Sequence, residues 1–448
     1  MRFDLISVFP EFFDVLKLSL VGKAREHGLL DIHAHNLRDW TTDPHRTVDD
    51  TPAGGGAGMV MRPDIWGKAI DTALRAGSGR QVLAIPTPSG TPLTQRACED
   101  LSHADQVIVA CGRYEGIDAR VAQHYAGQAE VFEFSLGDYV LNGGEIAAVA
   151  LVEAVGRLIP GVVGNAQSLV EESFSEAGLL EYPVYTRPEE WRGLTIPSVL
   201  TSGDHGAARR WRRDRALDRT VERRPEMIAA LDAATLDKKD RRYLASLGYL
   251  VPKSAPHPER AEVRPASASD VPALVALAAR TFPDACPPAM SPASIAAFIN
   301  EHLSERAFAE YLADPHWVTT VLISGGRPAG YTLALLPEGN GVAGAEDGAP
   351  DGVVERDGPL VELSKVYVDR AYRGTGATAW LMDATLARLD EATSDYPRPV
   401  VWLGTNAGNR RAQHAYRKAG FEKVTTREFL VGEERNSDVV MARPLRVA

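Results

Sequence analysis

The stretch of sequence most informative about the fold is Ser135-Leu-Gly-Asp-Tyr-Val-Leu-Asn-Gly-Gly-Glu145. A second glycine-containing turn, Cys111-Gly-Arg-Tyr-Glu-Gly-Ile-Asp118, precedes it in the chain. Each turn directly follows an apolar run typical of a β-strand, Gln106–Ala110 and Val131–Phe134. Such turns expose backbone amides and carbonyls at strand ends, where open α/β sheets bind ligands, so two of them together predict a clasp for a nucleoside-like ligand. The alternative is a pair of tight turns that serves only the fold.

Length and composition set the outer limits. A chain of 448 residues exceeds the usual size of one hydrophobic core and predicts two or three domains. The formal net charge of -11 argues against general coating of nucleic acid, so any nucleic-acid role depends on a local basic patch. The cysteines Cys98, Cys111 and Cys286 are odd in number and lack metal-site spacing. Without a signal-peptide pattern or an apolar run approaching about 18 residues, we expect a soluble cytoplasmic protein that does not enter a membrane.

Residues 1 to about 160 alternate short apolar runs with helical patterns such as Ile146–Leu158. This alternation predicts an α/β sheet with parallel strand pairs. No G-x-G-x-x-G motif follows the first strand, which argues against an ordinary dinucleotide site and favours another mode of binding an adenosyl cofactor. The expected strands are Phe3–Val8, Val82–Ile85, Val107–Cys111 and Val131–Phe134.

The rest of the chain divides by composition. Residues 161–172 lack periodicity and are interpreted as a connector, and residues 173–249 as a helical region with helices at Ala207–Arg224 and Pro225–Leu236. Residues 250–262 contain three prolines and predict a semi-rigid linker before a second domain at 263–448. The Gly-rich and acidic segment Pro337–Pro359 predicts a flexible surface loop.

The two glycine-containing turns resemble, almost letter for letter, the cofactor loops of the bacterial tRNA (guanine-N(1))-methyltransferases, which are SPOUT enzymes. The resemblance spans residues 1 to about 248. It implies an S-adenosylmethionine site in a trefoil-knotted domain, a homodimer, and methyl transfer to N(1) of the guanosine at position 37 of tRNA. Magnesium is a possible helper by family analogy alone, and no metal ligands are assigned.

Methylation of a guanine ring nitrogen requires removal of its proton. S-adenosylmethionine is already activated, so the protein must supply alignment, a carboxylate base and a cation for the charge that develops on the base's oxygen. The candidates are Glu171 or Glu172 as the base and Arg157 as the cation. Arg157-Leu-Ile-Pro-Gly161 and Glu171-Glu-Ser-Phe174 match two family motifs, and the match places Glu172 where the family has a shorter Asp.

The same resemblance implies further contacts with the cofactor and the target base. Glu115 matches an acidic residue that accepts hydrogen bonds from guanine's donor edge. The loop Thr51–Met59, which includes Gly55, Gly56 and Gly58, matches a loop near the target guanine, although a disordered hinge is the alternative. The implied cofactor residues are Pro86, Thr87, Gly112, Tyr114, Leu136, Gly137, Asp138, Tyr139, Val140, Leu141, Gly143 and Gly144.

The helix predicted at Ala207–Arg224 concentrates positive charge within an acidic protein. It carries eight arginines, and a local cation surplus of this kind is what RNA phosphates require. Arg209, Arg212 and Arg213 are the predicted tRNA contacts; the alternative is a solvated charged face. His33-Ala-His35 lies near Asp31 and could form a metal site. Alternation of side chains along a β-strand is the simpler explanation of this pattern.

The C-terminal half contains a second nucleotide-type pattern. The strand-like run Val361–Val368 is followed by Arg370-Ala-Tyr-Arg-Gly-Thr-Gly-Ala-Thr378 and then by the amphipathic run Trp380–Leu389. A Gly-rich turn between a strand and a helix directs backbone amides toward a phosphate. With Asn409-Arg-Arg-Ala-Gln-His-Ala-Tyr-Arg-Lys-Ala-Gly-Phe421, this order resembles the GNAT acyl-CoA N-acyltransferases.

The GNAT resemblance implies acetyl-CoA as a second cofactor. It makes Tyr416 the general acid for the thiol leaving group, and Thr378 stands where the family usually has a smaller residue. The acceptor amine is unknown, and Thr281–Pro288 lies where substrate loops occur. The implied acetyl-CoA contacts are Val368, Arg373, Gly374, Thr375, Gly376, Ala377 and Asn409.

Together these patterns predict a SPOUT-type α/β knot domain, a small helical region and an α+β GNAT domain in one bifunctional enzyme. The alternative is a non-catalytic RNA-binding protein with a degenerate GNAT module, in which Glu172 marks a lost base.

Overall fold

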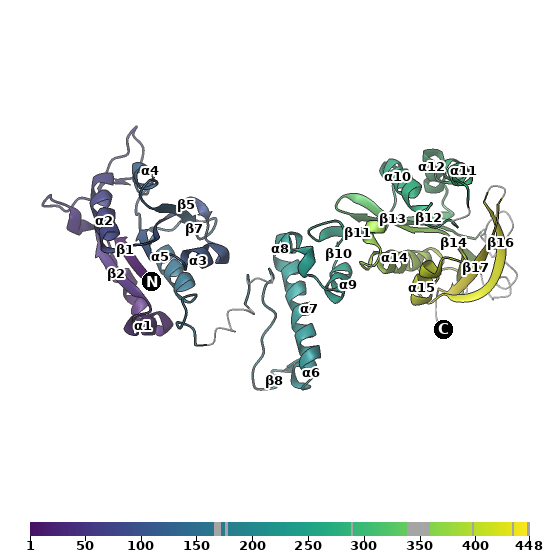
Figure 1. The fold of residues 1–448 in the computed structure, drawn as a ribbon, viewed down its shortest axis with the longest axis horizontal. Coiled ribbons are helices and arrows are strands. Elements are labelled where there is room, and N and C mark those ends of the chain that lie inside the picture. The colour runs from purple at the N-terminus through teal and green to yellow at the C-terminus, as the bar shows by residue number, and fades with distance from the viewer. Residues whose placement is uncertain are drawn as a thin grey trace. The chain divides into compact units, whose positions relative to one another are not determined.

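A computed structural model describes residues 1–164, 172–174, 178–287, 290–337, 353, 359–396, 398–431 and 434–445. The chain forms two compact units, Met1–Glu176 and Ala177–Ala448, each with its own sheet (Figure 1). Residues 165–171 of the predicted connector, including Glu171, lie outside the described residues, as does most of the predicted loop between Pro337 and Pro359. No helix among the described residues is long and apolar enough to span a membrane.

The N-terminal unit is built on a five-stranded parallel sheet with strand order β2-β1-β6-β5-β7. The strands are β1 Arg2–Ser7, β2 Asp31–Asn36, β5 Gln81–Pro92, β6 Gln106–Ala110 and β7 Glu130–Ser135; a short antiparallel pair joins β3 Asp49–Asp50 and β4 Val60–Met61. The helices are η1 Pro10–Lys17, α1 Ser19–Glu26, η2 Leu37–Trp40, α2 Pro63–Ala76, α3 Gln95–Leu101, α4 Arg120–Tyr125 and α5 Glu145–Gly156.

This sheet is buried on both faces. Val107 and Val109 of β6 pack in a core with η1, α1, α3 and α5, whereas Ile108 and Ala110 face a second core with α2 and α4. A strand that is covered on both faces has a continuous run of apolar residues, so these strands could be predicted from the sequence. The predicted parallel α/β sheet and the predicted helix after the second loop are confirmed. The predicted knot stays a prediction.

The C-terminal unit begins with a helical region. Its elements are the hairpin β8 Glu190–Trp191 and β9 Leu194–Thr195, then α6 Ser198–Thr201, α7 His205–Arg223, α8 Pro225–Ala230, η4 Ala233–Thr235 and α9 Lys238–Ser246. The predicted arginine-rich helix is confirmed as α7. The helix predicted at Pro225–Leu236 is wrong in length, because Leu231 is extended and the Asp232 side chain caps a new turn by accepting a hydrogen bond from Ala234 N.

An eight-stranded sheet forms the rest of this unit, in the order β10-β11-β12-β13-β14-β15-β17-β16. Among the described residues of this sheet, β14 and β15 are the one pair that runs parallel. Helices α10, α11 and α12 cover one face, and α9, α14 and α15 lie on the other, in keeping with the predicted α+β domain. The strands are β10 Tyr249–Leu250, β11 Glu259–Pro265, β12 Trp317–Ser324, β13 Arg327–Leu335, β14 Leu360–Val368, β15 Val400–Asn406, β16 Glu422–Val431 and β17 Glu434–Pro444. The helices are α10 Val271–Thr281, α11 Pro292–His302, α12 Glu305–Ala313, α14 Ala377–Ala392 and α15 Arg410–Lys418, with the short turn η6 Arg370–Tyr372.

The proline-rich segment expected to separate two bodies instead connects two paired strands. Tyr249 and Leu250 of β10 pair antiparallel with Arg260 and Glu259 of β11, so β11 begins four residues before the predicted domain start at Val263. Backbone pairing and a shared apolar core therefore join the helical region to the second sheet. The proposed domain boundaries stay a prediction.

Candidate active sites

Three loops predicted to hold a cofactor meet at one end of the N-terminal sheet. Gly144 N donates a hydrogen bond to Gly112 O at 2.9 Å. A Cβ atom at Gly144 would lie 2.9 Å from Cys111 Cα and 3.1 Å from Pro86 Cγ, so only glycine permits this approach. The structure thus brings together Pro86 in the middle of β5, where the pairing with β7 is interrupted, the end of β6 and the start of α5. Ligands of open α/β sheets bind at strand ends of this kind.

These loops are anchored by a buried carboxylate to which the sequence analysis assigned no role. Glu145 begins α5 and is buried, and its Oε1 accepts hydrogen bonds from Ser7 Oγ at 2.6 Å and Arg113 Nε at 3.1 Å. The Arg113 guanidinium also lies 4.7 Å from the ring centre of Phe9. The feature of the sequence that could have identified Glu145 is an acidic residue in the first turn of a helix that is otherwise nearly apolar. Glu145 connects β1, the loop after β6 and α5.

The loop after β7 presents an exposed apolar rim. Tyr139, Val140 and Leu141 are 56%, 80% and 40% exposed, and Tyr114 on the neighbouring loop is 55% exposed. A Cβ atom at Gly137 would lie 2.9 Å from the Tyr139 ring, so glycine lets the ring lie flat against the turn. These side chains can cover an adenosyl group held by the backbone of the turns.

The predicted guanine-reading residues also come together. A Cβ atom at Gly58 would lie 2.3 Å from Glu115 Oε1, which places the carboxylate directly over the glycine-rich loop. Glu115 N donates to Met59 O at 3.0 Å and joins the two loops. Gly55 and Gly56 have φ of 80° and 123° with open space around them. The structure therefore supports one shared position for the glycine loop and Glu115.

Arg157 and Glu172, the two candidate catalytic residues, form a two-point ion pair. Arg157 Nη1 donates to Glu172 Oε2 at 2.6 Å and Nη2 donates to Oε1 at 2.7 Å. The hydrogen bonds from Arg157 hold the pKa of Glu172 below its usual range, so the carboxylate is ionised at neutral pH. Both side chains are about one third exposed, at 36% and 31%. The pair is accessible to a substrate.

This ion pair lies at the opposite end of α5 from the cofactor loops. The loops adjoin Gly144 at the N-terminus of α5, and Arg157 follows its last residue, Gly156. The helix has 12 residues and therefore spans about 18 Å at 1.5 Å per residue. Within one chain the predicted base does not reach the predicted methyl donor site.

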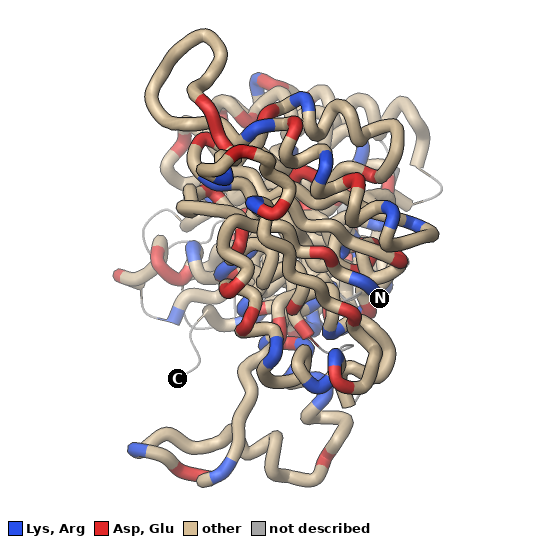
Figure 2. The backbone as a smooth tube through the Cα atoms, turned by 90° about the vertical axis from the view of Figure 1, so that its left-hand side faces the viewer, with Lys and Arg blue, Asp and Glu red and all other residues tan. Residues whose placement is uncertain are grey.

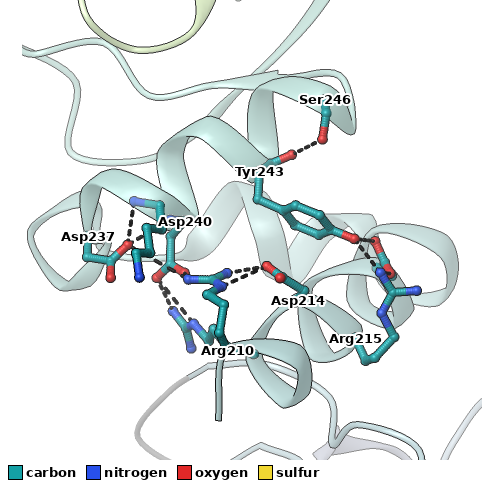
Figure 3. Close-up of polar contacts among 10 residues, drawn as sticks. Arg210, Asp214, Arg215, Asp237, Asp240, Tyr243 and Ser246 are labelled. Atoms are coloured by element: carbon teal, nitrogen blue, oxygen red, sulfur yellow. Dashed lines mark hydrogen bonds and ion pairs between the residues drawn. The ribbon is translucent and has the colours of Figure 1, made fainter. Parts of the chain in front are cut away.

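The arginine-rich helix α7 uses part of its charge internally. Arg210 Nη1 donates to Asp240 Oδ1 at 2.7 Å (Figure 3). Arg213 Nη2 donates to Asp240 Oδ2 at 3.1 Å. Asp240 on α9 is only 4% exposed, and Arg210 also pairs with Asp214. Arg213, a predicted tRNA contact, is thus a bridge between α7 and α9 in this structure.

Two other arginines of α7, Arg209 and Arg212, take no part in the contact with Asp240. Arg209 is exposed, and no described residue forms an ion pair with it, while the Arg212 guanidinium lies 5.3 Å from the Tyr182 ring centre. Figure 2 shows Lys and Arg residues interspersed with Asp and Glu along the backbone, so the surplus at α7 is local. A surface hollow of about 460 Å³ lies here, lined by Arg209, Arg210, Arg213, Thr235, Asp237, Lys239 and Asp240.

In the C-terminal sheet, the predicted acetyl-CoA loop follows a partly unpaired strand. β14 pairs with β15 only over Leu360–Glu362, and the described residues form no ladder between the two strands beyond that point. Gly376, with φ of 99°, is the N-cap residue of α14. A strand, a Gly-rich turn and a helix N-terminus are therefore in the order that phosphate binding requires.

The predicted acetyl-CoA residues differ in their surroundings. Thr375 Oγ1 donates to Tyr372 O at 2.7 Å, and the Asn409 side chain caps α15 by accepting from Ala412 N at 3.1 Å. Val368 and Ala377 are buried in the core, and Gly374 is exposed. The backbone of the loop, rather than these side chains, is available to a ligand.

Tyr416, the predicted general acid, is buried on α15. Burial first and nearby Asp438 second raise the pKa of Tyr416 to about 12, so its hydroxyl keeps its proton at neutral pH. Sequence reasoning missed Lys365 on β14, which lies 5.8 Å from the Phe298 ring centre. Burial lowers the pKa of Lys365 to about 8, and a basic residue in a β-strand gave no signal of this.

The histidines that suggested a metal site are paired with acids. His33 contacts Asp31 and His35 contacts Asp4, each at 2.8 Å, on the exposed end of β2 and beside β1. Among the described residues, no group of three or more histidine, cysteine or acidic side chains could hold a metal ion.

Two families match separate parts of the chain. The family described as tRNA (Guanine-1)-methyltransferase TrmD matches residues 1–230, and the Acetyltransferase (GNAT) family matches residues 274–421. Both predicted resemblances are confirmed.

Curated relatives match the N-terminal part closely. A tRNA (guanine-N(1)-)-methyltransferase of Bifidobacterium longum subsp. infantis is 54% identical over 270 residues, covering 58% of this chain and 99% of the relative. The enzyme of the same name from Pseudarthrobacter chlorophenolicus is 52% identical over 269 residues, covering 59% of this chain and all of the relative. That of Salinispora tropica is 55% identical over 249 residues, covering 56% and 96%. The chain therefore belongs to the tRNA (guanine-1)-methyltransferase family, and it carries a GNAT acetyltransferase domain after the methyltransferase segment.

Proposed function

We propose that the N-terminal unit transfers a methyl group to N(1) of the guanosine at position 37 of tRNA, with Glu172 as the base. The observation that carries this proposal is the two-point ion pair between Arg157 and Glu172. An ionised carboxylate beside a guanidinium matches the N(1)–H and O6 edge of guanine, which offers a donor beside an acceptor.

The cofactor loops fit S-adenosylmethionine. The close approach at Gly144 leaves a cradle of backbone groups, and exposed Tyr139 and Leu141 can cover the adenosyl group. When bound, S-adenosylmethionine supplies the activated methyl group.

In the proposed mechanism, guanine takes the place of the direct contact between Arg157 and Glu172, so that each of these side chains contacts the base. Glu172 accepts the N(1) proton, and Arg157 turns its donors toward O6, where negative charge develops. Glu115, held over Gly58, accepts hydrogen bonds from the guanine amino group and fixes the orientation of the ring.

We further propose that a homodimer completes the site. An apolar surface runs over η1, α1 and the start of α5, and η1 contacts both helices. Exposed apolar side chains in such number mark an interface. Through this interface a second copy can bring its cofactor loops to the Arg157–Glu172 pair of the first copy. Within one copy, the length of α5 separates the cofactor loops from that pair by about 18 Å. The exposed residues are Phe9, Phe12, Val15, Leu18, Leu20 and Ile146. Sedimentation equilibrium of the full chain measures this state.

The experiment that tests the proposed methylation is mass spectrometry of nucleosides from tRNA incubated with the protein and S-adenosylmethionine. We expect 1-methylguanosine at position 37, and no product from a tRNA in which another base occupies that position. Binding of tRNA without any methylated nucleoside would instead favour a non-catalytic RNA-binding protein. We place the reaction in the cytoplasm, and magnesium stays a prediction by family analogy.

Arg209, which is exposed, and Arg212, which is half-buried beside Tyr182, are expected to bind tRNA phosphates. Replacing Arg209 and Arg212 with Ala should weaken tRNA binding and lower the slope of log K against log salt by about one unit per lost phosphate contact. Filter binding across a salt series measures the slope. Arg223→Ala, at the other end of α7, serves as the matched control, and an unchanged slope in the double variant would identify a merely solvated face.

For the C-terminal domain we propose acetyl transfer from acetyl-CoA to an amine. Support comes from the GNAT match, the loop before α14 and the proton kept by Tyr416. Tyr416→Phe should retain acetyl-CoA binding and reduce turnover of acetyl-CoA by about 10²-fold, because the departing thiolate loses its proton donor. Release of free thiol in the presence of candidate amines gives the rate.

The pH profile adds a check on this role. Because the pKa of Tyr416 is raised to about 12, the protonated form that acts as an acid persists below that pH and is lost only above it. Wild-type turnover should therefore show no basic limb from Tyr416 below about pH 10. A Phe variant with wild-type turnover would exclude Tyr416 as the acid.

A further inference from the structure

Asp284, which follows α10, pairs with two arginines of the predicted acetyl-CoA loop. Arg373 Nη1 contacts Asp284 Oδ2 at 2.8 Å, and Arg370 Nε donates to the same oxygen at 2.7 Å. Arg373 Nε also donates to Val368 O at 2.9 Å. The loop therefore offers backbone amides to a phosphate but little free positive charge, although acyl-CoA carries three phosphate groups.

The helical region packs directly against this loop. A Cβ atom at Gly376 would lie 2.7 Å from Ala245 Cβ and 4.0 Å from Arg242 Cα, so α9 approaches the first turn of α14 as closely as a glycine allows. Lys253 N donates to Ala371 O at 2.9 Å and ties the segment after β10 to η6. Ala245 shares one core with Ala377, the first residue of α14.

Two cationic residues, Arg242 on α9 and Lys253 after β10, belong to the part of the chain that packs against the loop before α14. Arg242 and Lys253 are both exposed, and no described residue forms an ion pair or a side-chain hydrogen bond with either. Neither lies within residues 1–230 or 274–421, the parts of the chain that the two families match.

The backbone of Arg242 is held in place before any ligand binds. Asp240, two residues earlier on α9, is buried and accepts hydrogen bonds from Arg210 and Arg213 of α7. Ala245 anchors the other end of α9 against Gly376. Binding of a phosphate by Arg242 therefore costs the conformational freedom of its side chain but requires no ordering of the helix that carries it.

We propose that Arg242 and Lys253 bind the phosphate groups of acyl-CoA, so that the helical region and the GNAT domain build the acyl-CoA site jointly. This inference rests on the proposed acyltransferase function. The loop amides before α14 hold one phosphate group, and the two cations supply the charge that Asp284 withdraws from Arg370 and Arg373.

Calorimetry with acetyl-CoA on the full-length chain tests this site. Arg242→Ala and Lys253→Ala should each raise the Kd roughly threefold to tenfold, and the double variant should raise it further. Arg242→Lys should recover part of the affinity, because it keeps the charge and loses the planar donors. The salt dependence of binding should flatten in both Ala variants, whereas the thermal midpoint should not move.

Arg306→Ala is the matched control, since Arg306 is an exposed helical arginine on α12, on the other face of the sheet. If the wild type binds acetyl-CoA and both Ala variants bind it within twofold, the proposal is overturned and the acyltransferase function stands. If the wild type does not bind acetyl-CoA at millimolar concentration, the acyltransferase function and this proposal fall together.

Discussion

Replacing Glu172 with Gln is expected to reduce methyl transfer to tRNA by at least about 10²-fold. The amide keeps the shape of the side chain and a contact with Arg157, but it cannot accept the N(1) proton of guanine. Because Glu172 lies at the far end of α5 from its own cofactor loops, affinity for S-adenosylmethionine should stay near that of the wild type. Single-turnover methylation and calorimetry with S-adenosylmethionine measure the two quantities.

Two companion variants sharpen this result. Glu153→Gln removes a nearby exposed carboxylate of α5 that does not form the ion pair, and it should leave the rate unchanged. Glu172→Asp should keep much of the activity, since the family resemblance places Asp at this position. Glu172→Gln activity within a few-fold of the wild type would exclude Glu172 as the base, and an inactive Asp variant would show that the surroundings are adapted to the longer side chain.

Replacing Arg210 with Met is expected to lower the free energy of unfolding of the C-terminal unit by about 3 kcal/mol. The buried carboxylate of Asp240 then keeps Arg213 as its one partner from α7, and Asp214 loses its ion pair. Met retains the apolar stem, so the loss reports the charged contacts rather than packing. Urea unfolding followed by circular dichroism measures the change.

Arg223→Ala on the last turn of α7 is the control for this stability test. Its contact with Glu222 is long, at 4.0 Å, and both side chains are exposed, so its effect should stay within about 0.5 kcal/mol. If Arg210→Met unfolds at the wild-type midpoint, the ion pairs of Arg210 contribute nothing measurable, and Arg213 and the apolar core suffice to hold α9 against α7.

The confirmed elements share one property, which is that their signal is local. In the buried strand β6, residues 107–110 form an unbroken apolar run because both faces of the strand are covered. The helix α7 can be predicted from its composition alone. The glycine at 144 belongs to a sequence pattern that predicts a tight turn, and the close approach of the Cys111 backbone excludes a side chain there. The lengths of weaker helices could not be predicted in this way. The helix α8 ends before Leu231, and the extended backbone of Leu231 depends on its surroundings in the folded protein.

The spacing of neighbouring residues was enough to predict the parallel sheet, the glycine-containing turns at its edge, the arginine-rich helix, and the strand and loop that lead into the helix beginning at Ala377. Which side chains meet could be learned only from the folded structure. Arg157 pairs with Glu172, Arg213 with Asp240 and Arg373 with Asp284, across 15, 27 and 89 positions of the chain, and α9 packs on Gly376. Contacts between residues so far apart depend on how whole elements pack, and no local periodicity records that packing.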